Sequence, residues 1–365
     1  MNVPYLDLRA EFNTEEVFAV VKEQLEKAFF VGGPAIDEFE ERFAKVCGTR
    51  FSIGVNSGTD ALFLVMRALG IGPGDEVITA PNSFLASAGA VAQAGATPTF
   101  CDVRSDYMLD PDKLEAAITD KTRAIIPVHL TGAPAPMGQI MEIATARGLH
   151  VIEDCAQAIC ATENGKLVGS FGIAGGFSLH PLKNLPVAGD GGMITTDDEE
   201  LRDRLLILRN HGLIDRNTTA EFAYNSRLDA IQAAIGNVGL DRLEGITKRR
   251  IENAKRYDRL LGGLEPNVVL PPRRAEGVTV FHTYVIQVER RDELQAHLLE
   301  KGIETKIHYP IPIHLQPPCR AMGHSEGDFP VCESQAVRII SLPIHQHLTP
   351  EQIDYVAQVI TAFYG

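Results

Sequence analysis

The sequence predicts an α/β fold of two domains: a large domain with a mostly parallel mixed sheet over residues 1–240, and a smaller α+β domain over residues 241–365. In the first two-thirds, short apolar runs alternate with helical patterns, which is typical of a sheet covered by helices. After about residue 240 this alternation stops and a long charged helical stretch begins. A chain of 365 residues also has room for about two domains.

Four apolar runs predict buried strands of the large domain. They are Glu76–Thr79, Thr97–Cys101, Ala124–Val128 and His150–Ile152. Each is bounded by Gly, Pro or Asp, as buried strands tend to be.

Three helices are predicted between these strands. They cover Thr59–Leu69, a segment that begins at Asp110-Pro111, and Pro136–Arg147. Asp and Pro are favoured at the N-cap and first helical position, and a glycine follows both the first and the third segment.

The smaller domain combines helices with one strand. The pattern predicts a charged helix over Asp241–Leu261, turns over 265–277, a strand over Val278–Val288 and a final helix over Pro350–Phe363. Thr349 precedes this last helix and Gln352 follows three residues later, which is the spacing of a capping box.

Composition narrows the classes of function. Lys and Arg number 34 and Asp and Glu 48, so the net charge is 34 − 48 = −14, which argues against nucleic acid or an anionic membrane as the main partner. No run approaches the roughly 18 apolar residues of a membrane span, and the N-terminus does not read as a secretory signal. The six cysteines form neither a C-x-x-C pair nor a zinc-binding set, so we expect reduced thiols, no metal site and a cytoplasmic protein.

The first candidate for chemistry is Ser57-Gly58-Thr59, where a predicted helix begins. Free backbone N–H groups and the helix dipole suit a phosphate there, and a glycine lets the backbone approach closely. Plain capping of the helix by Ser or Thr is the alternative interpretation.

The second candidate is Asp154, directly after a buried strand. A carboxylate in that position is costly unless it is paired or capping. It either pairs with a protonated heterocyclic nitrogen, such as that of pyridoxal phosphate, or caps a helix. The neighbouring Cys155 is interpreted as a small buried filler.

The third candidate is Lys183, in a turn-like stretch between apolar and glycine-rich flanks, with Ser178 five residues earlier. A lysine among apolar neighbours can have a lowered pKa and form a Schiff base, although most lysines lie at the surface. Neither a P-loop nor a G-x-G-x-x-G motif between a strand and a helix is present, so a nicotinamide site has no support. Each of the three signals is weak alone. A phosphate-binding helix start, an acid for a ring nitrogen and a loop lysine, in this order, are far more specific in combination.

With these residues the sequence resembles the DegT/StrS-type sugar aminotransferases, a branch of the fold-type I enzymes that use pyridoxal phosphate. The resemblance covers essentially the whole chain. Its landmarks are Ser57-Gly-Thr-Asp-Ala-Leu62, Gly74-Asp-Glu-Val-Ile78, Glu153-Asp-Cys-Ala-Gln-Ala158, Phe177-Ser-Leu-His-Pro-Leu-Lys-Asn184, Gly189-Asp-Gly-Gly192, Asn225-Ser-Arg-Leu-Asp229 and Ile307-His-Tyr-Pro-Ile-Pro312.

The resemblance implies a role for each matching position. Lys183 would form the Schiff base, Asp154 would pair with the pyridinium nitrogen, and Gln157 would contact the ring hydroxyl. Gly58, Thr59 and Ser178 would hold the phosphate, while Phe84 would stack on the ring. Asn225 would reach the phosphate bound to the partner subunit of an obligate homodimer. Arg227, His308 and Tyr309 would lie on the substrate side, with packing of the small domain as the alternative for the last two.

The implied reaction is transfer of an amino group from a donor, by analogy L-glutamate, to a keto sugar, by analogy a nucleotide-linked 3- or 4-keto-deoxysugar. Lys183 would take part in a ping-pong scheme in which pyridoxamine phosphate is the intermediate form of the cofactor. A pyridoxamine-dependent sugar dehydratase of the same fold carries a histidine in place of this lysine, so Lys183 argues against that alternative. A non-catalytic sensor or regulator that binds the cofactor is the second alternative.

The chain departs from the family pattern at Leu182, at Thr131 and in Cys160-Ala-Thr-Glu163, which puts the usual substrate in doubt. The triplet Lys248-Arg249-Arg250 either attracts a diphosphate or forms a solvated helix face, and the second interpretation is favoured.

Overall fold

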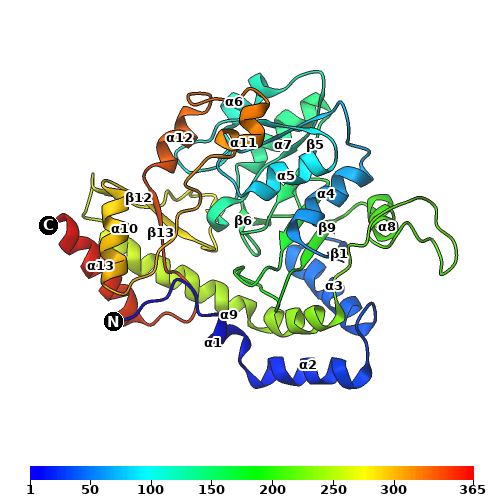
Figure 1. Cartoon of the computed structure of the whole chain (residues 1–365), viewed down its shortest axis with the longest axis horizontal. Helices are drawn as coiled ribbons and strands as arrows, with labels where there is room; N and C mark the ends of the chain where they lie inside the picture. Colours follow the sequence, from blue (N-terminus) through cyan, green and yellow to red (C-terminus); the bar gives the residue numbers. More distant parts are fainter.

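A seven-stranded sheet forms the centre of the large domain. The computed structural model describes residues 1–365, and Figure 1 shows the sheet with helices packed around it. The strand order is β1-β9-β8-β5-β4-β2-β3. The strands are β1 (Phe51–Val55), β2 (Glu76–Thr79), β3 (Thr97–Phe100), β4 (Thr122–Ile126), β5 (His150–Asp154), β8 (Ala174–Ser178) and β9 (Gly192–Thr196). These strands are mostly buried, and their glycine-poor members are rich in Val and Ile.

All strands but β9 run in the same direction. The pairs β2–β3, β2–β4, β4–β5 and β5–β8 are parallel, whereas β9 is antiparallel to both β8 and β1. This is the mostly parallel mixed sheet that the sequence predicts. The carboxyl ends of the parallel strands meet at one edge, which is where ligands bind in such sheets.

Helices cover both faces of the sheet. The helices α4 (Gly58–Ala68), α5 (Leu85–Gln93) and α8 (Glu199–Leu208) share one apolar core with the strands, while α3 (Pro34–Cys47), α7 (Met137–Arg147) and α9 (Ala230–Leu261) pack on the opposite face. The remaining helices of this part of the chain are α1 (Leu8–Phe12), α2 (Glu15–Lys27), α6 (Pro111–Ala117) and η1 (Leu130–Gly132). The four predicted strands and three predicted helices of this domain are confirmed, with ends shifted by at most two residues.

Two small antiparallel sheets complete the fold. The first joins β10 (Val268–Val269), β12 (Tyr284–Val288) and β13 (Ile339–Leu342), and the second joins β11 (Gly277–Val278), β6 (Thr162–Glu163) and β7 (Lys166–Leu167). The C-terminal helices are α10 (Arg291–Glu300), η2 (Ile313–Leu315), α11 (Pro317–Ala321), α12 (Pro330–Ala336) and α13 (Pro350–Tyr364). Helix α13 begins with the predicted capping box between Thr349 and Gln352.

Helix α9 is much longer than predicted. It begins at Ala230 rather than near Asp241 and crosses the lower part of Figure 1. The sequence pattern did not predict its first turns, which contain Gly236 and Gly239, because glycine lowers the stability of a helix. These glycines are needed for close packing: a Cβ at Gly236 would lie 2.6 Å from the Phe39 ring. The division at residues 240 and 241 falls inside this continuous helix and stays a prediction.

The predicted strand over Val278–Val288 is wrong in its first half. Only Tyr284–Val288 forms β12, because the preceding residues leave the extended conformation. Phe281 has a φ of 51°, and Val280 N–H donates to Gly132 O (2.9 Å) in the large domain. A continuous apolar pattern does not reveal this detour.

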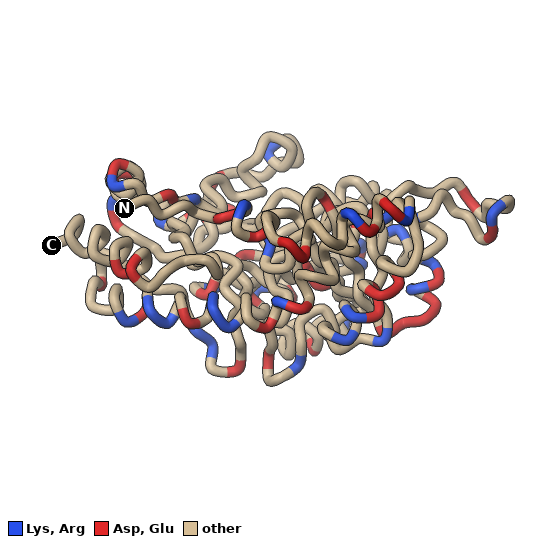
Figure 2. Tube along the Cα trace, turned by 90° about the horizontal axis from the view of Figure 1, so that it is seen from below, with Lys and Arg blue, Asp and Glu red and all other residues tan.

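Charged residues of both signs are interspersed along the chain in Figure 2, and no long basic stripe stands out in that view. None of the helices combines the length and the apolar character that a membrane crossing requires.

Candidate active site

The start of helix α4 presents free backbone donors. Ser57 is its N-cap, and the Ser57 hydroxyl accepts the Asp60 N–H (3.0 Å), so the capping interpretation is confirmed. This cap leaves the N–H groups of Gly58 and Thr59 without a partner in the chain. A Cβ at Gly58 would lie 2.7 Å from the Ser178 Cβ at the end of β8. Capping and anion binding are therefore compatible here, since different N–H groups serve each.

Asp154 ends strand β5 and is 6% exposed. Its Oδ2 accepts the Ser87 hydroxyl (2.7 Å) and its Oδ1 accepts the Ala156 N–H (3.2 Å). Ser83 supports Ser87 through a hydroxyl contact of 2.8 Å. No helix begins after Asp154, so the helix-cap alternative is wrong. Its carboxylate instead points a negative charge into the edge of the sheet where the strands end.

Lys183 lies in the turn after β8 and is half-buried rather than a free surface lysine. Its backbone N–H donates to His180 O (2.8 Å), while its side chain forms no hydrogen bond or ion pair. Burial lowers the pKa of the Lys183 amine to about 8, and the nearby Asp154 carboxylate opposes this shift. An amine with this pKa is neutral in a substantial fraction near physiological pH, as a nucleophile or base must be.

Gln157, Tyr309 and Phe84 form one contiguous wall. The Gln157 Oε1 accepts the Thr131 N–H (2.7 Å), and its Nε2 donates to the Tyr309 hydroxyl (3.4 Å). The Tyr309 ring lies 5.7 Å from the Phe84 ring, which is 55% exposed. An exposed aromatic face beside buried polar groups is suited to stacking against a planar ligand. Burial and the Asp154 charge raise the pKa of the Tyr309 hydroxyl, which therefore stays protonated.

His308 lies beside this wall. Its Nδ1 is 2.8 Å from the Ser341 hydroxyl, and its ring lies 5.9 Å from that of Tyr5. Burial, together with the charges of Lys183 and Lys306, lowers the pKa of His308 to about 4, so the imidazole is neutral at pH 7. The packing interpretation of His308 and Tyr309 is confirmed, and their place on the substrate side stays a prediction.

Asn225 and Arg227 lie outside this constellation. Asn225 is exposed and pairs through its backbone with Asn210. The Arg227 guanidinium donates to the Asn210 Oδ1 (2.8 Å) and lines a different cavity of about 370 Å³. No hydrogen bond joins either residue to Lys183, Asp154 or Ser178 within the chain.

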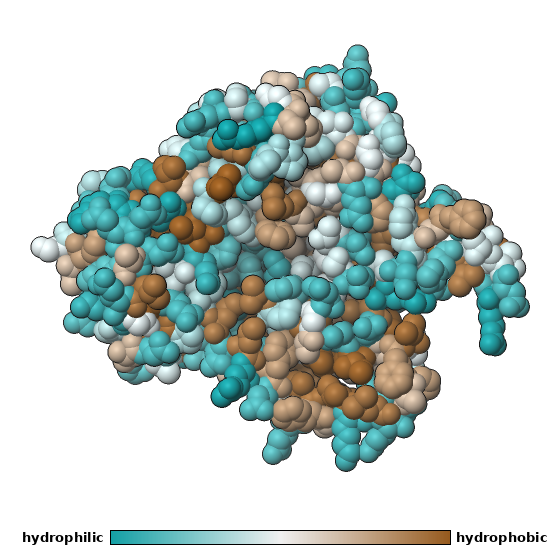
Figure 3. Space-filling view, viewed as in Figure 1, coloured by the Kyte–Doolittle hydropathy of each residue, from teal (hydrophilic) through white to brown (hydrophobic).

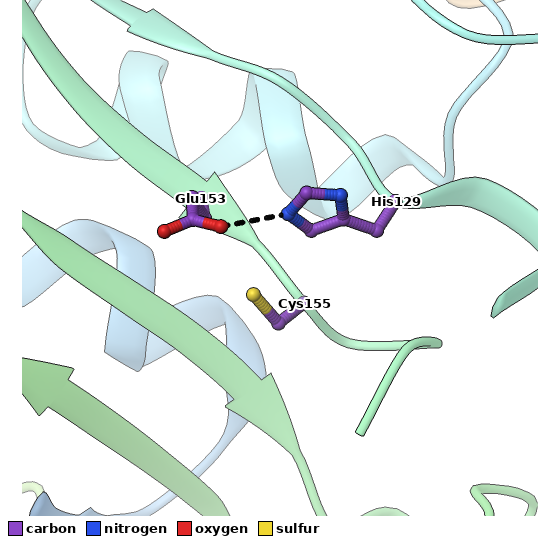
Figure 4. A group of neighbouring side chains, drawn as sticks. All are labelled: His129, Glu153 and Cys155. Carbon is purple, nitrogen blue, oxygen red and sulfur yellow. Dashed lines mark hydrogen bonds and ion pairs between the residues drawn. The ribbon is translucent and has the colours of Figure 1, made fainter. Parts of the chain in front are cut away.

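Glu153, next to Asp154, supports the site from the other face of β5. Figure 4 shows His129 pointing its Nε2 at Glu153 (3.0 Å), with Cys155 below. The carboxylate also accepts three backbone N–H groups of residues 169, 171 and 172 at 2.7–2.9 Å. Because the His129 Nδ1 accepts the Ala135 N–H (2.9 Å), His129 donates to Glu153 as a neutral ring. Glu153 and His129 therefore use their polar atoms in hydrogen bonds that hold the end of β5 in place. The sequence did not predict this cluster.

Cys155 and Arg250 are both buried. Cys155 is 1% exposed, which confirms the buried filler. The solvated interpretation of Lys248-Arg249-Arg250 is wrong for Arg250, which is 1% exposed on the inner face of α9. Its guanidinium donates to the Gln346 Oε1 (3.1 Å) and to the Phe281 carbonyl (3.0 Å). Residues four apart share a helix face, and Ile246 and Ala254 place Arg250 inward.

The fold is that of the fold-type I transferases. The match to the family model covers residues 12–361 and bears the description "DegT/DnrJ/EryC1/StrS aminotransferase family". The chain belongs to this family.

Three relatives span nearly the whole chain. A "pleiotropic regulatory protein" of Geobacillus stearothermophilus is 43% identical, over 100% of this chain and 99% of its own. A "dTDP-3-amino-3,4,6-trideoxy-alpha-D-glucose transaminase" of Streptomyces venezuelae is 42% identical (96% and 93%). A "UDP-N-acetyl-3-dehydro-alpha-D-glucosamine 3-aminotransferase" of Acidithiobacillus ferrooxidans is 44% identical (98% and 97%).

Solved structures agree with this membership. DesV of S. venezuelae, determined in complex with a ketimine intermediate, has a TM-score of 0.97 at 41% identity and covers 100% of this chain and 98% of its own. The pyridoxal phosphate form of the sugar aminotransferase Spr1654 of Streptococcus pneumoniae has a TM-score of 0.91 at 29% identity, with 96% of both chains covered. The chain is thus an aminotransferase by fold and by family.

Proposed function

We propose that this aminotransferase uses pyridoxal phosphate to move an amino group from L-glutamate to a nucleotide-linked keto sugar, through Lys183. The proposal depends on the half-buried Lys183 side chain. Burial lowers the pKa of its amine to about 8, and the charge of the nearby buried Asp154 carboxylate acts on it. An unpaired lysine and a buried acid near the carboxyl ends of parallel strands suit a cofactor that has both a carbonyl group and a basic ring nitrogen.

The residues present fit this cofactor. The unpartnered N–H groups of Gly58 and Thr59, beside Ser178, would hold its phosphate at the positive end of α4. Asp154 would pair with its ring nitrogen, Phe84 would stack on its ring, and Gln157 would contact its hydroxyl. When bound, pyridoxal phosphate supplies an electron sink for the negative charge that develops at the carbon bearing the amino group.

The protein's own groups then move protons. The Lys183 Nζ takes a proton from the Cα of the amino donor, because its lowered pKa keeps a neutral fraction available. The Asp154 carboxylate, fixed by Ser87 and the Ala156 N–H, would stabilise positive charge at the ring nitrogen of the bound cofactor. The neutral His308 and the protonated Tyr309 offer hydrogen bonds to a sugar without adding charge.

A keto sugar is the acceptor that the relatives support. Two of them are named for 3-amino or 3-keto sugars, one linked to dTDP and one to UDP, so we propose a nucleotide-linked sugar with a ketone at C3 or C4. Leu182, 44% exposed beside Lys183, lines a narrow cavity with residues of the N-terminal segment, including Leu8 and Glu11. These side chains are candidates for selecting the acceptor.

The test is an amination assay with separate half-reactions. Purified protein with pyridoxal phosphate is given L-glutamate, and we expect its absorption near about 400–430 nm to fall as the pyridoxamine form accumulates. Dialysed protein in that form is then offered dTDP- and UDP-linked 3- and 4-keto sugars, with amination read by mass. Parallel lines in initial-rate plots are expected for a ping-pong scheme. Cofactor binding without amino transfer to any acceptor would instead indicate a sensor or regulator.

We further propose a homodimer whose partner subunit completes each site. Asn225 and Arg227 form no hydrogen bond with Lys183, Asp154 or Ser178 of their own chain, and they adjoin a segment that carries exposed apolar side chains. Phe222 is fully exposed, and Phe18, Leu25, Phe29, Phe30 and Val31 are each at least 46% exposed. In Figure 3 apolar atoms gather low in the view, over α2. A monomer rarely leaves so many large apolar residues in one region in water.

Mixing two inactive variants tests this assignment. We expect Lys183→Ala and Asn225→Ala each to be strongly impaired alone, and unfolded and refolded equal mixtures to recover about a quarter of the wild-type activity. Half of the dimers would then be mixed, with one of two sites intact in each. If both residues served a site within one chain, every site in a mixed dimer would carry a defect, and no activity would return. Sedimentation of the mixture checks that dimers have formed.

A further inference from the structure

The segment 280–283, which crosses from the large domain into β12, is anchored along its whole length. The Val280 N–H donates to Gly132 O (2.9 Å), and the Thr283 N–H donates to Thr131 O (3.3 Å). From the other side, the Arg250 guanidinium donates to the carbonyls of Phe281 (3.0 Å) and His282 (3.3 Å). A backbone tied at four successive residues places the His282 side chain with little freedom.

His282 contacts the residue that follows Lys183. Asn184 is 3% exposed, and its Nδ2 donates to the Val280 carbonyl (3.2 Å). Because a carbonyl can only accept, this bond fixes the amide orientation and turns the Asn184 Oδ1 toward the His282 Nδ1 (3.4 Å). The Oδ1 is an acceptor, so the His282 Nδ1 carries the proton. The Nε2 of the neutral ring is then left with a lone pair.

The charges that act most strongly on this ring come from four basic side chains. Lys183 and His180 come from the turn after β8, Arg250 comes from α9, and His308 precedes η2. Burial and these four groups all lower the pKa of His282 far below its ordinary value. The imidazole therefore stays neutral throughout the physiological range, as its hydrogen bond to Asn184 requires only one ring proton.

We propose that His282 is a positioning residue for Lys183: its Nδ1–H holds Asn184, and thereby the turn that keeps the Lys183 amine in its buried position. This inference rests on the proposed role of Lys183. It gives a role to Arg250, a costly buried cation between α9 and segment 280–283, since its donors fix the backbone that carries the imidazole.

Two replacements separate the hydrogen bond from mere filling of space. In His282→Asn the Nδ2 is attached to Cγ, as the Nδ1 of histidine is, so it can still donate to the Asn184 Oδ1. In His282→Gln the amide nitrogen is one bond farther from the backbone and misses that oxygen. The readout is the pH dependence of acetylation of Lys183 by acetic anhydride in the full-length, cofactor-free protein, mapped by peptide mass.

We expect the midpoint near pH 8 to persist in the wild type and in His282→Asn. In His282→Gln, loss of the hydrogen bond to Asn184 should release the turn and expose the Lys183 amine to water. Its midpoint should then rise toward the ordinary lysine value of about 10.4, by about one unit, so labelling at pH 7 slows about tenfold. A matching loss of the visible band with pyridoxal phosphate is expected at that pH.

Two results would overturn the inference. One is an unchanged midpoint in His282→Gln, and the other is an equal drop in unfolding temperature for both variants with no difference in labelling, which would mean a structural role alone. The proposed function fails separately, if the wild-type protein forms no visible band with pyridoxal phosphate. Acetylation reports on His282 even in that case, because it needs no cofactor.

Discussion

Replacement of Lys183 by alanine is expected to abolish amino transfer, with a loss of at least about 10⁴-fold in kcat, since both the covalent attachment and the proton transfer depend on one amine. Folding should survive, because the Lys183 side chain forms no hydrogen bond or ion pair and its backbone N–H bond to His180 O remains. The checks are the initial rate with L-glutamate and a keto-sugar acceptor, and the absorption near about 400–430 nm with pyridoxal phosphate, which should be missing.

The pH dependence of cofactor capture by the wild-type protein tests the role of Lys183 independently. With the pKa of the Lys183 amine at about 8, the rate of cofactor capture should rise about tenfold per pH unit up to pH 7 and level off above pH 8. An ordinary surface lysine would keep rising toward pH 10. Lys183→Arg, which keeps a cation of similar length, is the matched control and should be as inactive as the alanine variant. Residual turnover above about one hundredth of wild type in either variant would remove Lys183 from the proposed role.

Local patterns in the sequence predicted much of the fold. The strand Glu76–Thr79 and the capping box at Thr349 depend on neighbouring residues only, and both are confirmed. The same holds for the end of α7 at Gly148, which has the left-handed φ of 65° that glycine tolerates. Segment 280–283 could not be predicted, because its course depends on hydrogen bonds to residues about 150 positions away.

Some residues of the candidate site could be predicted from the sequence and others could not. Asp154 and Ser178 could be found because each ends a strand, and Lys183 because it lies between recognisable flanks. The groups that tune them were missed, since nothing near Ser87 or His282 in the chain signals a contact with Asp154 or Asn184. Arg250 was missed for a related reason: a charged residue is expected in solvent unless its helix face is known to be buried. The sequence therefore indicated the candidate reactive groups better than the groups that set their pKa values.

Asp154→Asn is expected to lower kcat by about 10²–10⁴-fold, the range for the loss of a fixed charge aimed at developing charge in an active site. The replacement has the same shape, and the Ser87 hydroxyl, which Ser83 can also orient, is free to turn and accept from the new amide. We therefore expect nearly wild-type unfolding temperature and a large loss in turnover, measured as the rate of the glutamate half-reaction.

Acetylation of Lys183 gives a second measurement, which is expected to rise in Asp154→Asn while turnover falls. The Asp154 charge holds the pKa of the Lys183 amine up against the effect of burial. Its removal should lower that pKa below about 8, so acetylation of Lys183 at pH 7 in the cofactor-free protein should become faster while turnover falls. Ser87→Ala, which keeps the charge and removes one hydrogen bond, should change the labelling little and lower kcat by about tenfold at most. If Asp154→Asn slowed labelling as well, the carboxylate would be acting through the fold rather than through its charge, and its assignment to the ring nitrogen would fall.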